Sequence, residues 1–176
     1  DWLREKQLDG KYQDMYRKQV SELARKLRNA IDGINPELPL WVIPSFFGIF
    51  ANPMLTGLST QKAPVVFSDE NTYGKPTSVL SDDEAIEANL KRCINNQKAL
   101  AKLNIPFVYL AAVGNNESGS AAYRGRAAIQ MAKISNGLWC FEDINPYKNT
   151  DLKRDELWQA FAEVNREVAN GTYQEN

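Results

Sequence analysis

The sequence predicts an α/β fold in which parallel strands alternate with helices, and three observations support this prediction. Short apolar segments of the kind found in buried strands are separated by segments with helical periodicity. Turn-forming Gly, Pro, Asn and Ser residues lie between them. The chain has 176 residues, of which 43% are hydrophobic, which is enough for one well-packed core. We therefore expect a single α/β domain over residues 1–176.

Helices are predicted where apolar residues recur at spacings of three and four. The longest stripe, on the first helix, predicts a face turned toward the core, and Gly33 and Pro36 predict the end of that helix. A capping box, Ser81-Asp-Asp-Glu84, begins the second helix. The stripe of the first helix consists of Tyr12, Met15, Tyr16, Val20, Leu23, Leu27 and Ile31. The predicted helices are residues 11–32, 81–100, 121–135 and 151–169.

Strands are predicted in four short apolar runs, each of which is flanked on both sides by turn-forming residues. The segment 45–62 has no clean period, and we expect a long loop with one helical turn there. The predicted strands are residues 38–43, 63–67, 105–113 and 138–141.

Composition excludes several classes of function. Lys and Arg total 21 against 22 Asp and Glu, so the chain lacks the basic surplus of a dedicated nucleic-acid-binding protein. The absence of histidine excludes Ser-His-Asp and Cys-His catalysis and the common zinc sites, and we expect neither a metal nor a cofactor. No apolar run is long enough to predict a membrane span, and the charged start predicts no signal peptide. Cys93 and Cys140 are expected to be buried free thiols, although a disulfide between them stays open.

Acidic, amide and aromatic residues gather where the predicted strands end. In parallel sheets these ends meet at one edge, where sites are commonly built. Carboxylates and amides bind hydroxyl groups, aromatic faces stack on sugars, and paired carboxylates hydrolyse glycosidic bonds. The candidate catalytic residues are Glu70, Glu142 and Glu117. The candidate substrate-binding residues are Asp69, Tyr73, Asn115, Asn116, Trp139 and Asp143.

Three further patterns bear on the site. The apolar neighbours Trp139 and Phe141 are expected to raise the pKa of Glu142, as a proton donor requires. The loop 114–119 matches neither dinucleotide nor P-loop spacing, which argues against a nucleotide site. Arg124 and Arg126 are expected to form surface ion pairs.

Three segments resemble parts of (β/α)8-barrel glycoside hydrolases. Residues 123–143 resemble the last helix-strand step of such a barrel, and residues 157–167 resemble its final helix. Residues 63–70 are similar to a barrel strand that ends in a substrate-facing acid. The resemblance implies that the four strands are strands five to eight, the C-terminal half of a TIM-type barrel. It also implies a carbohydrate substrate, glycosidase activity and an extracellular or cell-envelope location.

Alternatives to this interpretation remain open. A full barrel takes about 250 residues, so the chain is either part of a barrel or a small open α/β sheet. The first case calls for an N-terminal half-barrel or a second copy as partner. The abrupt start, just before a helix, favours a preceding part. In function, the alternatives are a non-catalytic sugar- or small-solute-binding domain and a flavodoxin-like regulatory domain.

Overall fold

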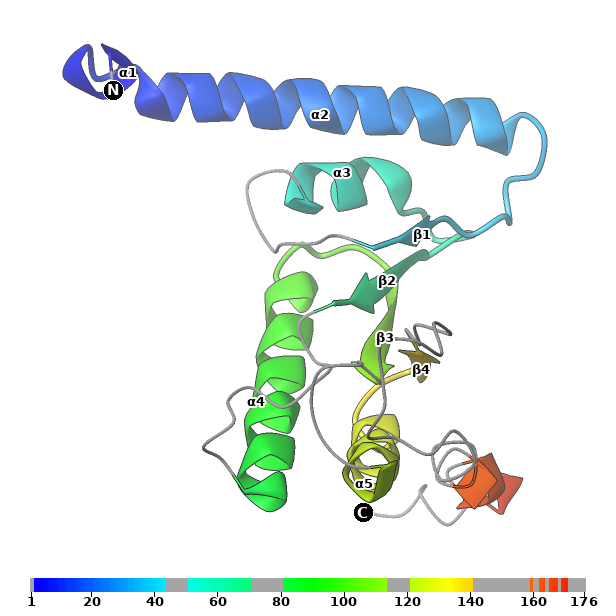
Figure 1. Ribbon diagram of the computed structural model, residues 1–176. Coiled ribbons are helices and arrows are strands. Elements are labelled where there is room, and N and C mark those ends of the chain that lie inside the picture. The colour runs from blue at the N-terminus through cyan, green and yellow to red at the C-terminus, as the bar shows by residue number, and fades with distance from the viewer. Residues whose placement is uncertain are drawn as a thin grey trace, which may run out of the picture. The chain divides into compact units, whose positions relative to one another are not determined.

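The computed structural model describes most of the chain and is shown in Figure 1. Described are residues 2–43, 51–70, 81–113 and 121–140, together with positions 159, 162–163, 165–167 and 169–170. The elements are α1 (Trp2–Glu5), α2 (Asp9–Asp32), β1 (Trp41–Val42), α3 (Ala51–Leu58), β2 (Val65–Asp69), α4 (Asp82–Ala101), β3 (Phe107–Val113), α5 (Ala121–Ala132) and β4 (Gly137–Cys140).

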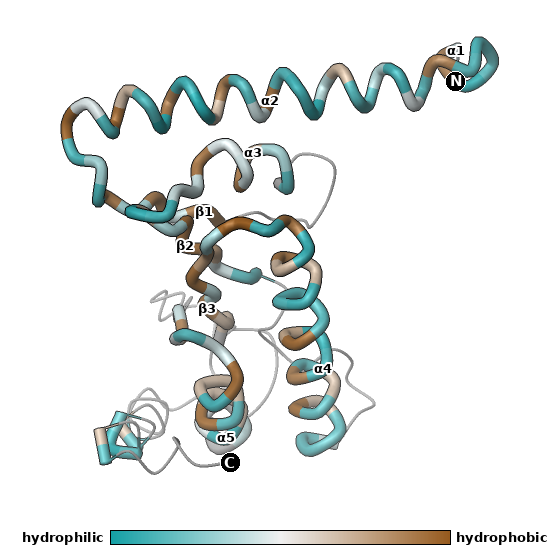
Figure 2. The backbone as a smooth tube through the Cα atoms, turned by 180° about the vertical axis from the view of Figure 1, so that it is seen from behind, coloured by the Kyte–Doolittle hydropathy of each residue, from teal (hydrophilic) through white to brown (hydrophobic). Residues whose placement is uncertain are grey.

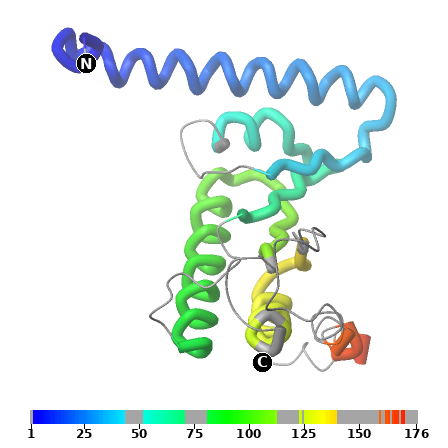
Figure 3. The backbone as a smooth tube through the Cα atoms, viewed as in Figure 1, coloured from blue at the N-terminus to red at the C-terminus, as the bar shows by residue number. Residues whose placement is uncertain are grey.

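The four strands form one parallel sheet in the order β1-β2-β3-β4, which confirms the predicted α/β fold. Trp41 pairs with Val66 between β1 and β2, and Ala112 pairs with Trp139 between β3 and β4. A helix follows each of the first three strands and leads to the next, as Figure 3 shows along the chain. Spatial order thus equals chain order, unlike the 2-1-3-4-5 order of flavodoxin-like folds.

The chain divides into two compact units. Unit 1 contains residues 1–67 and 99–108, and unit 2 contains residues 68–98 and 109–176. The division passes through β2 and β3, so each unit holds part of both strands.

Unit 1 is built on a close approach between α2 and α3. A Cβ atom on Gly57 would lie 2.5 Å from the Cβ of Ala24 and 2.6 Å from the carbonyl oxygen of Ser21. Only glycine at this position lets α3 lie so close to α2. Ala24 and Arg28 are the buried residues of α2 as a result.

The predicted core-facing stripe of α2 is largely wrong. Its side chains at Tyr12, Met15, Leu23 and Leu27 are 48 to 70% exposed. The reason is that α3 contacts α2 along the line of Ser21 and Ala24, beside the stripe rather than on it. Sequence periodicity identified the helix but not the face that its neighbour covers.

Helix α3 (Ala51–Leu58) is longer than the single helical turn predicted within the loop 45–62, of which residues 45–50 lie outside the described residues. Pro53 obscured the pattern, but the first turn of a helix tolerates proline because its N–H has no partner within the helix. After the helix, Ser59 donates a hydrogen bond from Oγ to the carbonyl of Pro106, and the amide of Val65 donates to the same Oγ at 3.4 Å. Ser59 thereby ties the first residue of β2 to the chain just before β3.

In unit 2, α4 packs against α5 through small and apolar side chains. Ala85 and Ile86 of α4 form a buried cluster with Tyr123 and Ala127 of α5, and Leu90 packs against it. Hydrophobic residues recur along α4 at helical spacing, as the brown bands in Figure 2 show. At the start of α4, the predicted capping box Ser81-Asp-Asp-Glu84 is confirmed.

The capping box begins α4 by two reciprocal bonds. The amide of Ser81 donates to Oε2 of Glu84 at 2.9 Å, and the amide of Glu84 donates to Oγ of Ser81 at 3.3 Å. These bonds satisfy donors that a helix start otherwise leaves open.

Element boundaries differ modestly from the predicted ones. β1 is confined to Trp41–Val42, and β2 runs from Val65 to Asp69, two residues later than predicted. Asp69, expected in a loop, is therefore the last residue of a strand. The predicted helix over 151–169 lies largely outside the described residues. Among the described helices, none combines the length and apolar character needed to cross a membrane.

Candidate functional site at the carboxyl end of β2

Asp69 is the centre of a buried polar network in unit 2. Its side chain is fully buried. Its Oδ2 atom accepts a hydrogen bond from Nδ2 of Asn96 in α4 at 2.6 Å and another from the hydroxyl of Tyr109 in β3. A buried carboxylate needs such donors, because it has lost the hydrogen bonds of water.

The main chain of Asp69 has a partner on a third element. The indole Nε1–H of Trp139, in β4, donates to the carbonyl oxygen of Asp69 at 3.2 Å. β3 lies between β2 and β4 in the sheet, so the indole reaches across the end of β3. The carbonyl of Asp69 belongs to the peptide bond with Glu70, so the main chain that leads to the half-buried Glu70 adjoins this bond.

The α4 side of the network contains a thiol and a second amide. Cys93 is free and buried, as predicted, and lies beside Tyr109. Gln97 donates from Nε2 to the Cys93 sulfur at 3.6 Å and to the carbonyl of Ile134 at 2.7 Å. Asn136 completes the support of Tyr109. Its side-chain Oδ1 accepts a hydrogen bond from the backbone N–H of Tyr109 at 2.9 Å, and its backbone N–H donates to the carbonyl of Tyr109 at 3.0 Å.

Burial sets the electrostatics of this network. It raises the pKa of Tyr109 far above the usual value for tyrosine, and the neighbouring charge of Asp69 raises it further. Burial also raises the pKa of the Cys93 thiol. Both groups are therefore protonated at neutral pH, which leaves the Tyr109 hydroxyl as a permanent donor to Asp69.

Of the predicted site residues, the structure describes Asp69, Glu70 and Trp139. It bonds Trp139 to the main chain of Asp69, and Glu70 follows Asp69 in the chain. The other candidates lie outside the described residues: Tyr73, Asn115, Asn116, Glu117, Glu142 and Asp143. The candidate site residues predicted from the sequence did not include Tyr109, Asn96 or Cys93. A signal for Tyr109 existed, since it carries the only hydroxyl within the apolar run of β3, Phe107–Val113.

The carboxyl edge of β2 carries polar groups of several kinds. Among the residues that the structure describes, no three Asp, Glu or Cys side chains are grouped as metal ligands. This edge contains a buried carboxylate, a partly buried indole and a main-chain carbonyl that bonds it.

A groove between α4 and α5 is separate from this edge. Its volume is about 270 Å³, and its lining contains none of the predicted site residues. It is lined by Asp83, Ile86, Glu87, Leu90, Arg126 and Gln130. Arg126 bonds Asp83 at 2.7 Å and Asp82 at 3.4 Å, which confirms the predicted surface ion pair for this arginine.

Comparison of the chain with protein-family models, with curated proteins and with solved structures finds no match.

Proposed function

We propose that this chain belongs to a carbohydrate-active hydrolase of the (β/α)8-barrel type, which cleaves glycosidic bonds by carboxylate chemistry. The observation that carries the proposal is the bond from the Trp139 indole to the Asp69 carbonyl. This bond supports the proposal because it joins an aromatic residue to the main chain just before the half-buried Glu70, at the carboxyl edge of a parallel sheet, where barrel enzymes hold their substrates. The sequential strand order supports a barrel segment over a flavodoxin-like domain.

Each residue has a distinct role in this proposal. The Trp139 ring stacks on the apolar face of a pyranose, and Glu70 is the acid/base that protonates the leaving oxygen. The second carboxylate comes from Glu142 or Glu117. Tyr73, Asn115, Asn116 and Asp143 are the remaining candidates for hydroxyl binding. Closing a barrel requires further strands, from an N-terminal half-barrel or a second copy.

The test combines binding and turnover on a panel of aryl glycosides of common hexoses and pentoses. We expect at least one glycoside to quench tryptophan fluorescence and to be hydrolysed. Glu70→Gln should lower kcat about 100-fold or more, the usual contribution of general acid–base catalysis, and keep binding. Glu37→Gln, an exposed change in unit 1, is the matched control and should leave both within twofold.

Two results would overturn the proposal. Binding without turnover in the unmodified chain would replace the hydrolase with a non-catalytic sugar-binding domain. The absence of both binding and turnover across the panel would remove carbohydrate as the ligand class.

A further inference from the structure

Asp69 was predicted to bind substrate, but its surroundings suit a different role. Its carboxylate is fully buried and already accepts bonds from Asn96 and Tyr109. A ligand hydroxyl has no open approach to it, because none of the Asp69 side chain is exposed. The indole of Trp139, in contrast, bonds the Asp69 main chain and is only partly buried.

The alternation of side chains along strands separates two faces of the sheet. The side chain of Asp69 lies on the face that carries Tyr109, because the two are bonded. Trp139 pairs with Ala112, three residues after Tyr109, and paired residues of parallel strands share a face. Trp139 is thus on the face opposite to Tyr109. Asp69 links the two faces, with its side chain bonded on one and its carbonyl on the other.

We infer that Asp69 and Tyr109 are positioning residues of the proposed sugar site, which hold the last carbonyl of β2 where the Trp139 indole and Glu70 need it. The inference rests on the proposed function for the identity of the ligand, and on the three bonds to Asp69 for the mechanical role. Tyr109 suits the task because it stays protonated and its backbone is fixed by Asn136 on both sides. Loss of its hydroxyl removes a bond that holds the end of β2, but it removes no group from the face of the sheet that carries Trp139.

The test uses two buried tyrosines of unit 2 as a matched pair. Tyr109→Phe removes the bond to Asp69, whereas Tyr123→Phe removes a bond from Asn89 to a hydroxyl outside this network. The main readout is the indole N–H signal of Trp139 in a nitrogen–proton correlation spectrum, assigned with Trp139→Phe. We expect Tyr109→Phe to shift this signal and to speed its hydrogen exchange about tenfold. Tyr123→Phe should change neither.

Kinetics separate a positioning role from a merely structural one. With a glycoside that the unmodified chain hydrolyses, Tyr109→Phe should lower kcat about tenfold while KM changes less than threefold. Asp69→Asn keeps the size of the side chain and its acceptor oxygen, and serves as a second variant if Tyr109→Phe misfolds by circular dichroism. We expect Asp69→Asn to shift the Trp139 signal relative to the unmodified chain, because it weakens the bonds that Asn96 and Tyr109 donate to the carboxylate.

Failure of this inference differs from failure of the proposed function. An unchanged Trp139 signal in Tyr109→Phe overturns the positioning role, whatever sugars the chain binds. A changed signal in a chain that binds no glycoside upholds the mechanical link but removes the sugar site that it was inferred to serve.

Discussion

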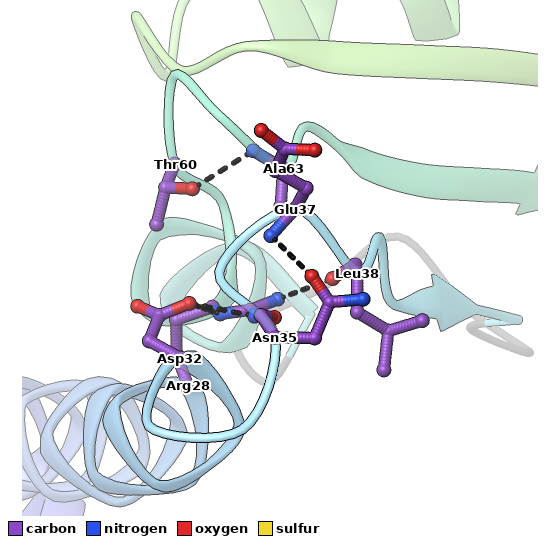
Figure 4. Close-up of polar contacts among 7 residues, drawn as sticks. All are labelled: Arg28, Asp32, Asn35, Glu37, Leu38, Thr60 and Ala63. Carbon is purple, nitrogen blue, oxygen red and sulfur yellow. Dashed lines mark hydrogen bonds and ion pairs between the residues drawn. The ribbon is translucent and has the colours of Figure 1, made fainter.

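Arg28 in unit 1 and Asp69 in unit 2 are both buried charged residues, but their partners lie at very different distances along the chain. Arg28 is 2% exposed and bonds Asp32 in the same helix and the carbonyls of Asn35 and Leu38 just after it, as Figure 4 shows. Asp69 bonds residues 27, 40 and 70 positions away. The first network closes once α2 and the following turn form. The second requires β2, α4, β3 and β4 together, and it is the one next to the candidate site.

The largest expected effect on the free energy of unfolding comes from breaking the network around Arg28, whose partners all lie within ten residues along the chain. Arg28→Met removes a guanidinium whose Nε is 2.8 Å from Asp32 and whose Nη1 is 2.7 Å from the Leu38 carbonyl. It leaves these acceptors without their donor, and we expect the free energy of unfolding to fall by about 3 kcal/mol. Urea denaturation followed by circular dichroism measures this loss.

The control for Arg28→Met lies three residues earlier on the same helix. Arg25 is exposed, and Arg25→Met should change the free energy of unfolding by less than about 0.5 kcal/mol. Equal losses in the two variants would show that the buried bonds of Arg28 do not stabilise unit 1 beyond an ordinary surface charge.

Sequence separation also explains how much could be predicted. The capping box of α4 was found because both partners lie within four residues, and the alternation of strands and helices was found because periodicity is a local property. The sequence predicted Asp69 and Trp139 for one candidate site, and the structure bonds the Trp139 indole to the main chain of Asp69. It could not show that the Asp69 side chain is occupied, because Asn96 and Tyr109 become its neighbours only after folding.

The covered face of α2 illustrates the same limit. The apolar stripe predicted a helix correctly, but the contact with α3 depends on Gly57, some thirty residues later in the chain than the residues it touches. The sequence around Gly57 has no clean period, so it carries no local signal for close helix packing. Tertiary contact, rather than amphipathicity, decides which side of α2 is buried.

Gly57→Ala tests this long-range contact in unit 1. The added Cβ would meet Ala24 at 2.5 Å and the Ser21 carbonyl at 2.6 Å, so α3 must move away from α2. We expect the free energy of unfolding to fall by about 2 kcal/mol, as is usual for overpacking. Urea denaturation of the two proteins side by side measures the difference.

Gly10→Ala is the matched control for Gly57→Ala, since a Cβ at Gly10 meets no atom within 4 Å. It should be neutral or stabilise the protein by up to about 1 kcal/mol, because alanine favours the helical conformation more than glycine does. A loss in Gly10→Ala as large as that in Gly57→Ala would mean that close packing is not what position 57 requires.

Tyr109→Phe has the smallest expected effect on the free energy of unfolding. Because this effect depends on pH, it distinguishes the network around Asp69 from the network around Arg28. Loss of one buried hydrogen bond should lower the free energy of unfolding by about 1 kcal/mol at pH 8. The pKa of Tyr109 is raised in the folded protein by burial and by Asp69, so above pH 10 or so the unfolded chain loses this proton first. Stability from Tyr109 is therefore fully present below about pH 10 and declines above it.

Urea midpoints measured at pH 8, 9.5 and 11 test this decline. The difference in midpoint between the unmodified chain and Tyr109→Phe should become smaller as the pH rises. Cys93, whose pKa burial raises and a hydrogen bond with Tyr109 lowers, adds a pH-dependent decline of its own, so both proteins are compared in a Cys93→Ala background. Arg28→Met supplies the reference, because its network contains no tyrosine or cysteine and its gap should stay constant over the same range. A constant gap for Tyr109→Phe as well would mean that the hydroxyl is not held protonated beside Asp69. The long-range network would then lack the feature that makes it a rigid support for the edge of the sheet.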